Sequence, residues 1–219
     1  MGLWCQGSKV GKETPLQQQR QASRSRRQTA SQRKAQAQTL NIGIFAIDPG
    51  GATGLAWAIV DPVVDIGDSL RGRMNAGSAT VKGDAREQIR EITSIWQSFY
   101  RSTVQFGCLP PENVWLVCED FIYRSDNQYG GEDSKISTAL IWGIEGYRMG
   151  QADEFMKRRG KKRLVMRDMI LQAPGLASGF ANNTRLRDWG CWVVGRDHER
   201  SAYRHLALFL KRYQQQHGF

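Results

Sequence analysis

The chain has 219 residues and a formal net charge of +10, with 40% hydrophobic and 24% charged residues. This length and balance predict one globular domain with an appendage, and no apolar run approaches the roughly 18 residues that a membrane-spanning helix needs. Because the N-terminus lacks the apolar core of a secretory signal, we expect a cytoplasmic protein without a membrane partner. The four cysteines lack CxxC spacing, which predicts separate thiols rather than a zinc site or a disulfide framework.

Residues 1–40 are expected to form a flexible, basic tail, and residues 41–219 the folded domain. The tail holds eight Lys/Arg and one acidic residue, Glu13, so its net charge is +7, which leaves +3 for 41–219. It is rich in Gln, Ser, Ala and Arg and cannot bury enough apolar surface to offset the entropy lost on ordering. Such a tail could contact nucleic acid phosphates, or it could act only as a solubilising segment.

Two apolar runs around a glycine-rich turn predict the first two strands. Residues 42–47 and 55–60 flank the sequence Asp-Pro-Gly-Gly at 48–51, and turn formers between β-prone runs are typical of strand, turn and strand. Asp48 would lie at the end of a buried strand. The glycines beside it have no side chains, so a metal ion or a phosphate could approach. An ordinary turn capped by its aspartate is the competing interpretation.

Periodicity predicts the remaining elements. Residues 63–80 are expected to form a third strand, and apolar residues at helical spacing predict a helix over 84–100. Residues 114–118 are typical of a buried strand, and Glu119 and Asp120 follow it directly. The later elements are a polar loop over 124–135, a second helix through 136–147, a fifth strand within 164–172, an irregular segment over 175–195 and a last helix over 197–213.

Two groups of basic residues are candidate contacts for a DNA backbone. Six of the seven residues from 157 to 163 are Lys or Arg, and arginines also form a stripe on the last helix. A solvated turn would explain the first group, but its place inside the compact domain favours a phosphate-contacting loop. The residues are Lys157, Arg158, Arg159, Lys161, Lys162, Arg163, Arg196, Arg200 and Arg204.

Three motifs carry the acidic residues and the polar face of the last helix. They are Ala-Ile-Asp-Pro-Gly-Gly-Ala-Thr-Gly at 46–54, Val-Cys-Glu-Asp-Phe at 117–121 and Gly-Arg-Asp-His-Glu-Arg-Ser-Ala-Tyr-Arg-His at 195–205. In this order the motifs resemble those of the RuvC-like Holliday-junction resolvases, most closely the bacteriophage versions. The resemblance covers about residues 42–212 and implies an α/β fold of the ribonuclease H-like class, with a mixed five-stranded sheet flanked by helices.

The resemblance also implies an activity. It points to a metal-dependent endonuclease that acts as a homodimer on branched DNA such as four-way junctions. The expected cofactor is Mg²⁺ or Mn²⁺, with two ions in the site. Asp48 would bridge the ions, Glu119 would hold one of them, and the last helix would supply a further ligand.

The last motif departs from the family at one position. The family typically reads His-x-x-Asp-Ala, and here Ser201 stands where the Asp is expected. A neutral hydroxyl is a poor replacement for a carboxylate ligand. Asp197, one turn earlier, could compensate, and His198 could ligate a metal or shuttle a proton, as histidines do near neutral pH. The candidate catalytic residues are Asp48, Glu119, Asp197, His198 and Ser201, and all except Ser201 are candidate metal ligands.

Ser201 leaves the activity open. Compensation by a neighbour, engineered inactivation and natural loss of activity all agree with the sequence, so a DNA-binding protein of the same fold that no longer cleaves is the alternative function. A minor alternative is one lobe of an actin-like ATPase or sugar kinase, because the turn at 48–51 followed by Thr53 is similar to their phosphate-binding hairpin. Those proteins need two such hairpins, and the sequence has one.

Overall fold

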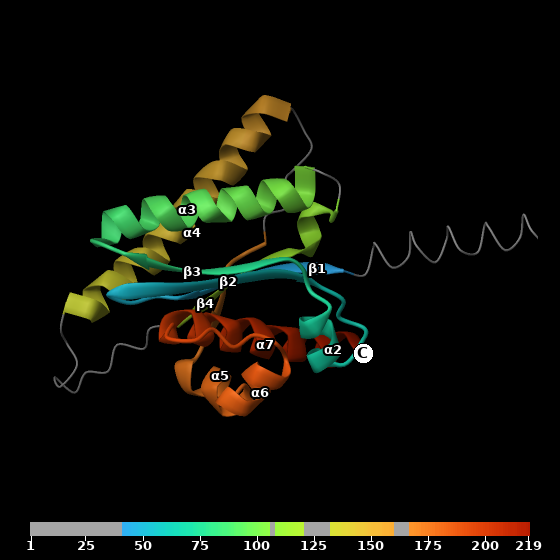
Figure 1. The fold of residues 1–219 in the computed structure, drawn as a ribbon. Helices are drawn as coiled ribbons and strands as arrows, with labels where there is room; N and C mark the ends of the chain where they lie inside the picture. Colours follow the sequence, from blue (N-terminus) through green and yellow to red (C-terminus); the bar gives the residue numbers. More distant parts are fainter. Residues whose placement is uncertain (1–40, 106–107, 121–131, 160–166) are drawn as a thin grey trace, which may run out of the picture. The chain divides into compact units, whose positions relative to one another are not determined.

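The computed structural model describes residues 41–105, 108–120, 132–159 and 167–219. These residues belong to one compact unit, Thr39–Phe219, in which a mixed five-stranded sheet is flanked by helices (Figure 1). The predicted α/β class and the five-stranded mixed sheet are confirmed. The tail predicted over 1–40 lies outside the described residues.

The sheet has the strand order β3-β2-β1-β4-β5. The bounds are β1 (Ile42–Asp48), β2 (Ala52–Val60), β3 (Met74–Lys82), β4 (Val114–Glu119) and β5 (Ile170–Gln172). Strand β2 pairs in the antiparallel direction with both β1 and β3, whereas β4 is parallel to β1 and β5 is parallel to β4. Because β1, β4 and β5 run in one direction, their carboxyl ends meet at the same end of the sheet.

Helices cover both faces of the sheet (Figure 1). One face carries α3 (Ala85–Tyr100) and α4 (Glu132–Arg159), and the other carries α7 (Asp197–His217). Three short helices lie on the side of α7: α2 (Ile66–Arg71), α5 (Pro174–Phe180) and α6 (Asn183–Asp188). A π-helical turn (Arg101–Gln105) and a 3-10 turn (Pro111–Asn113) connect α3 to β4.

The alternation of side chains along each strand assigns the strand residues to two core clusters. In β1, Ile44 and Ala46 pack in the cluster under α7, while Phe45 and Ile47 pack in the cluster under α3 and α4. Asp48 follows in the same alternation and therefore faces α7. In β4, Val117 belongs to the α7 cluster and Cys118 to the other, so Glu119 also faces α7.

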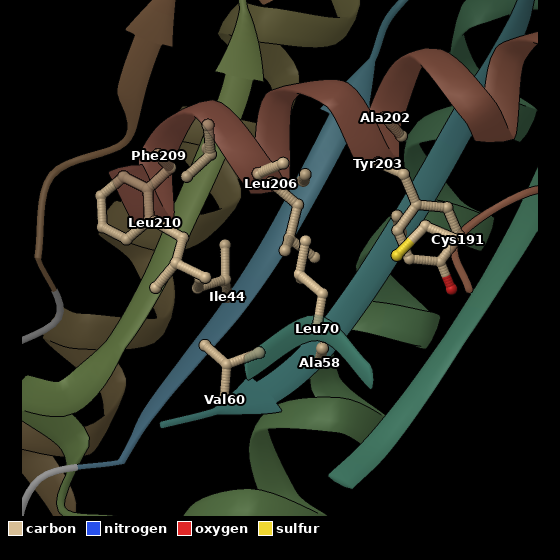
Figure 2. Packing of buried hydrophobic residues seen from close by; sticks show 14 of the residues in the cluster. Ile44, Ala58, Val60, Leu70, Cys191, Ala202, Tyr203, Leu206, Phe209 and Leu210 are labelled. Atoms are coloured by element: carbon tan, nitrogen blue, oxygen red, sulfur yellow. The ribbon is translucent and has the colours of Figure 1, made fainter. Parts of the chain in front are cut away.

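Helix α7 is anchored on the sheet by its apolar face. Leu206 and Leu210 are fully buried and pack in one cluster with Ile44 of β1, Val60 of β2 and Leu70 of α2 (Figure 2). Burying a leucine stabilises a fold by about 1.5–3 kcal/mol, so this face fixes α7 firmly against the strands. The helix predicted at the end of the sequence is confirmed.

The structure corrects several predicted elements. The strand predicted over 63–80 is α2 followed by β3, and the segment 175–195, predicted to be irregular, contains α5 and α6. Helices of six or seven residues are too short to show a clear period, although Asp65 and Asn182 cap α2 and α6 as helix-start signals.

The corrections at the remaining boundaries are smaller. The polar loop predicted over 124–135 is replaced from Glu132 onward by α4, and its residues 124–131 lie outside the described part. The fifth strand contains only the three residues of β5, and α7 extends to His217, beyond the predicted end at 213.

Two composition-based predictions can be compared with the structure. Cys108, Cys118 and Cys191 are free thiols, as predicted, and Cys5 lies outside the described residues. Within the described ranges, no helix combines the length and the apolar character that crossing a membrane requires.

Candidate active site

Two carboxylates meet where β1 and β4 end. Asp48 is the last residue of β1 and Glu119 the last of β4, and the parallel register pairs Ile47 with Cys118 immediately before them. The two carboxyl groups lie close enough to shift each other's pKa, so a proton between them relieves the repulsion of their charges. A cation would replace that proton and stabilise both charges. The chemistry of these oxygen donors fits a hard divalent ion such as Mg²⁺ or Mn²⁺.

The environment separates the pKa values of the two carboxyl groups. Burial, together with the hydrogen bond to and the charge of Glu119, raises the pKa of Asp48 to about 8, against a smaller opposing effect of Ser201 and Arg204. Burial also acts to raise the pKa of Glu119, but its hydrogen bonds with His205 and Asp48 lower it overall. The pair therefore holds a proton more strongly than an ordinary carboxyl group does.

Cation binding is expected to release about one proton at pH 7, because a cation needs both carboxylates ionised. Calorimetric titration with Mn²⁺ in buffers of different ionisation enthalpy measures this release. The release should fall to about a tenth of a proton at pH 9, one unit above the pKa of Asp48 at about 8. Glu91→Gln, on the exposed surface of α3, is the control and should release the same proton. An observed binding enthalpy that does not depend on the buffer at pH 7 would contradict the prediction.

Buried polar groups hold the turn that follows Asp48. Gln88 of α3 is fully buried and accepts a hydrogen bond from the Thr53 hydroxyl at 2.5 Å. Its Nε2 lies 3.3 and 3.2 Å from the carbonyl oxygens of Gly50 and Gly51. These contacts give Thr53 a structural role and fix the backbone next to the carboxylate pair.

Helix α7 directs a polar stripe at the two carboxylates. His198, Ser201 and His205 are spaced three and four residues apart, so they lie on one face of the helix. Nδ1 of His198 lies 3.6 Å from Oδ2 of Asp48, and Ser201 lies near enough to Asp48 to act on the pKa of its carboxyl group. Nε2 of His205 lies 2.7 Å from Oε2 of Glu119. Of the predicted residues, the structure thus brings together Asp48, Glu119, His198 and Ser201.

The structure places Asp197 in a different environment. Its side chain is 84% exposed and forms an ion pair with Arg200 of the same helix. The partner that the structure gives to Asp197 is therefore a cation of α7 rather than the carboxylate pair. Among the described residues, no three His, Cys, Asp or Glu side chains form a metal-binding group. The donors that fit a cation are the Asp48 and Glu119 carboxylates, with His198 beside them.

Two residues set the position of the first turn of α7. Glu199 is fully buried and accepts hydrogen bonds from Ser78 and Thr80 of β3. On β2, a Cβ added to Gly54 would lie 2.0 Å from the carbonyl oxygen of His198. The helix backbone therefore touches β2 directly, and Gly54 is required because it has no side chain. Gly54 pairs with Asp48 in the sheet, so this contact brings α7 to the carboxylates.

Gly54→Ala is expected to lower the free energy of unfolding by about 3 kcal/mol or more, because the added methyl group meets rigid backbone. Chemical denaturation would measure the loss. The control is Gly146→Ala in α4, where a new Cβ has no heavy atom within 4 Å. That change should stabilise the protein by about 0.5–1 kcal/mol, since alanine favours the helix. Equal stability of the two variants would contradict the close contact.

The predicted DNA-binding residues differ in how available they are. Arg196 is exposed, although it also pairs with Glu199. Arg200 donates to the carbonyl of Val193, and Arg204 donates to the carbonyl of Ala181. Lys157, Arg158 and Arg159 end helix α4, whereas Lys161, Lys162 and Arg163 lie outside the described residues.

Four polar residues of the site are not among those predicted from the sequence. His205 contacts both Glu119 and Gln172. Glu199 positions α7, and Gln88 holds the turn after Asp48. Only His205 had a signal in the sequence, because it follows Ser201 by four residues and shares its helical face. No model of a known protein family matches this sequence, and no curated protein is significantly similar to it.

Proposed function

We propose that the chain is a metal-dependent endonuclease of the ribonuclease H-like class that nicks branched DNA such as four-way junctions. The observation that carries the proposal is the Asp48–Glu119 pair, two carboxyl groups at the ends of adjacent parallel strands that shift each other's pKa. Additional support comes from the strand order β3-β2-β1-β4-β5 and from α7, whose polar stripe covers the pair. The three motifs that resemble RuvC-like resolvases supply the substrate class.

Each residue of the site has a chemical role under this proposal. Asp48 and Glu119 would hold a divalent cation, Mg²⁺ or Mn²⁺, which when bound supplies an activated water and stabilises charge on the phosphate. His198 is 48% exposed beside Asp48, so it can reach a DNA phosphate or accept a proton from water. Ser201 lies beside Asp48 and acts to lower the pKa of its carboxyl group.

The proposed contacts of the protein to DNA are mainly to the sugar-phosphate backbone. Arg196 stands at the start of α7, four residues before Arg200 and five before Ser201, and its exposed guanidinium can reach a phosphate. Arg200 and Arg204 would have to exchange their internal partners before they bind DNA. Backbone contacts carry no base sequence, so the branched shape would select the substrate. A homodimer is proposed because a four-way junction presents two equivalent strands to be nicked.

A second candidate function is binding of branched DNA without cleavage. Ser201 favours it, because a hydroxyl takes the place of a carboxylate ligand and the site holds one negative charge fewer. The lobe of an actin-like ATPase has less support. The described residues form one five-stranded sheet, whereas those enzymes enclose a nucleotide between two lobes.

The test compares a labelled four-way junction with a linear duplex of the same sequence, each incubated with the protein and Mg²⁺ or Mn²⁺. The proposal expects paired nicks in the junction, none in the duplex, and no nicking in EDTA. Glu91→Gln is the control variant and should nick like the unaltered protein. Tight junction binding without nicks would support the second candidate, and no preference for the junction would refute both.

A further inference from the structure

Gln172, His205 and Glu119 form a row of hydrogen-bonding groups between α7 and the ends of β4 and β5. Nδ1 of His205 lies 3.0 Å from Oε1 of Gln172, and its Nε2 lies 2.7 Å from Oε2 of Glu119. His205 and Gln172 are each 1% exposed. The parallel register of β4 and β5 pairs Glu119 with Gln172, so the imidazole connects the ends of two neighbouring strands.

The amide of Gln172 determines which nitrogen of His205 carries the proton. With Oε1 on Nδ1, the Nε2 of Gln172 is buried without a hydrogen-bond partner, which is costly for a donor. A half-turn of the amide exchanges its oxygen and nitrogen and brings the NH₂ group to Nδ1. Nδ1 then accepts, the ring proton is on Nε2, and Nε2–H donates to the Glu119 carboxylate. This arrangement gives both ring nitrogens a matched partner.

We propose that Gln172 and His205 are positioning residues that orient Glu119 for cation binding. Gln172 fixes the imidazole ring, and the ring holds one oxygen of Glu119, which leaves the other oxygen to face the cation beside Asp48. The inference rests on the proposed function, since it assumes a cation at this pair. Ser201 contributes no charge to the site. The affinity for the cation therefore depends on how the two remaining carboxylates, Asp48 and Glu119, are oriented.

The test measures Mn²⁺ affinity by electron paramagnetic resonance on the full chain without DNA. Groups that orient a ligand typically change metal affinity by about 10–100-fold, and His205→Phe should weaken binding by that factor. His205→Gln keeps a donor near the position of Nε2 and should retain most of the affinity. Gln172→Leu should weaken binding in the unaltered chain and have no further effect in His205→Phe. His217→Phe, an exposed histidine at the end of α7, is the control and should bind Mn²⁺ normally.

The outcomes separate this inference from the proposed function. If the unaltered protein binds no Mn²⁺, both are overturned. If it binds Mn²⁺ and His205→Phe binds equally well, or if the losses in His205→Phe and Gln172→Leu simply add, the positioning role alone is overturned. Nitrogen-15 spectra of the unaltered protein test the same inference without a variant that must fold. They should show the His205 proton on Nε2. A proton on Nδ1 alone would refute the proposed hydrogen bonds from Gln172 to His205 and from His205 to Glu119.

Discussion

Asp48→Asn is expected to abolish junction nicking while it stabilises the metal-free protein. Asparagine has the size of aspartate but no charge, so it cannot replace an anionic ligand. Since loss of a group that only orients a ligand costs about 10–100-fold, loss of the ligand itself should lower the nicking rate by more than about 100-fold. Nicking would be measured on the labelled four-way junction, with Glu91→Gln as the control that should stay active.

The stabilisation follows from the pKa of Asp48. This pKa is about 8 in the folded protein against an ordinary value of 3.8, so between these values the folded state binds a proton that the unfolded state lacks. The free energy of unfolding must then fall as the pH rises through this window. Glu119 acts in the opposite sense, because its pKa is lowered and its contribution is lost only in acid.

Denaturation in EDTA would therefore separate the variants by their pH dependence. The unaltered protein and Glu91→Gln should be less stable at pH 8 than at pH 6, and Asp48→Asn should lose most of this slope. A variant that is inactive and also less stable than the unaltered protein at pH 8 would show that Asp48 supports the fold rather than the chemistry.

The elements that the sequence predicted well are those with a long apolar run or a clear helical period. β1 and β2 are apolar runs because both of their faces pack in core clusters, whereas α3 repeats at helical spacing because one of its sides faces a cluster. α5 and α6 were missed since two turns of helix hold too few apolar positions to reveal a period. Their starting signals, Pro174 and Asn182, were present but are common in loops as well.

Part of the site was predictable because it follows from strand topology. Asp48 and Glu119 both end apolar runs, and parallel strands bring such ends together. The roles of Gln172 and Glu199 depend on which strand lies beside β4 and on how close α7 approaches β2, and neither fact is encoded locally. The arginine stripe shows the same limit, since the sequence could not reveal that Arg200 and Arg204 bind backbone carbonyls.

Ser201→Asp is expected to convert the site to one with three carboxylates. The new side chain would stand beside Asp48, where Ser201 now acts on the pKa of that residue, so it can reach the same cation. Because cation affinity rises with the number of anionic ligands, Mn²⁺ binding should tighten by at least about tenfold. Without metal, the variant places a third carboxylate beside the pair and gains repulsion between like charges, so its free energy of unfolding should fall by about 1–3 kcal/mol.

Ser201→Asn is the matched control, because it has the size of aspartate without the charge. It should bind Mn²⁺ no better than the unaltered protein, which separates the effect of charge from that of shape. Junction assays then decide the meaning of the serine. If the unaltered protein nicks and Ser201→Asp adds little, the Asp48–Glu119 pair supported by His205 is sufficient for catalysis. If only Ser201→Asp nicks, the serine has disabled a nuclease site that otherwise keeps its geometry, and the natural activity is binding.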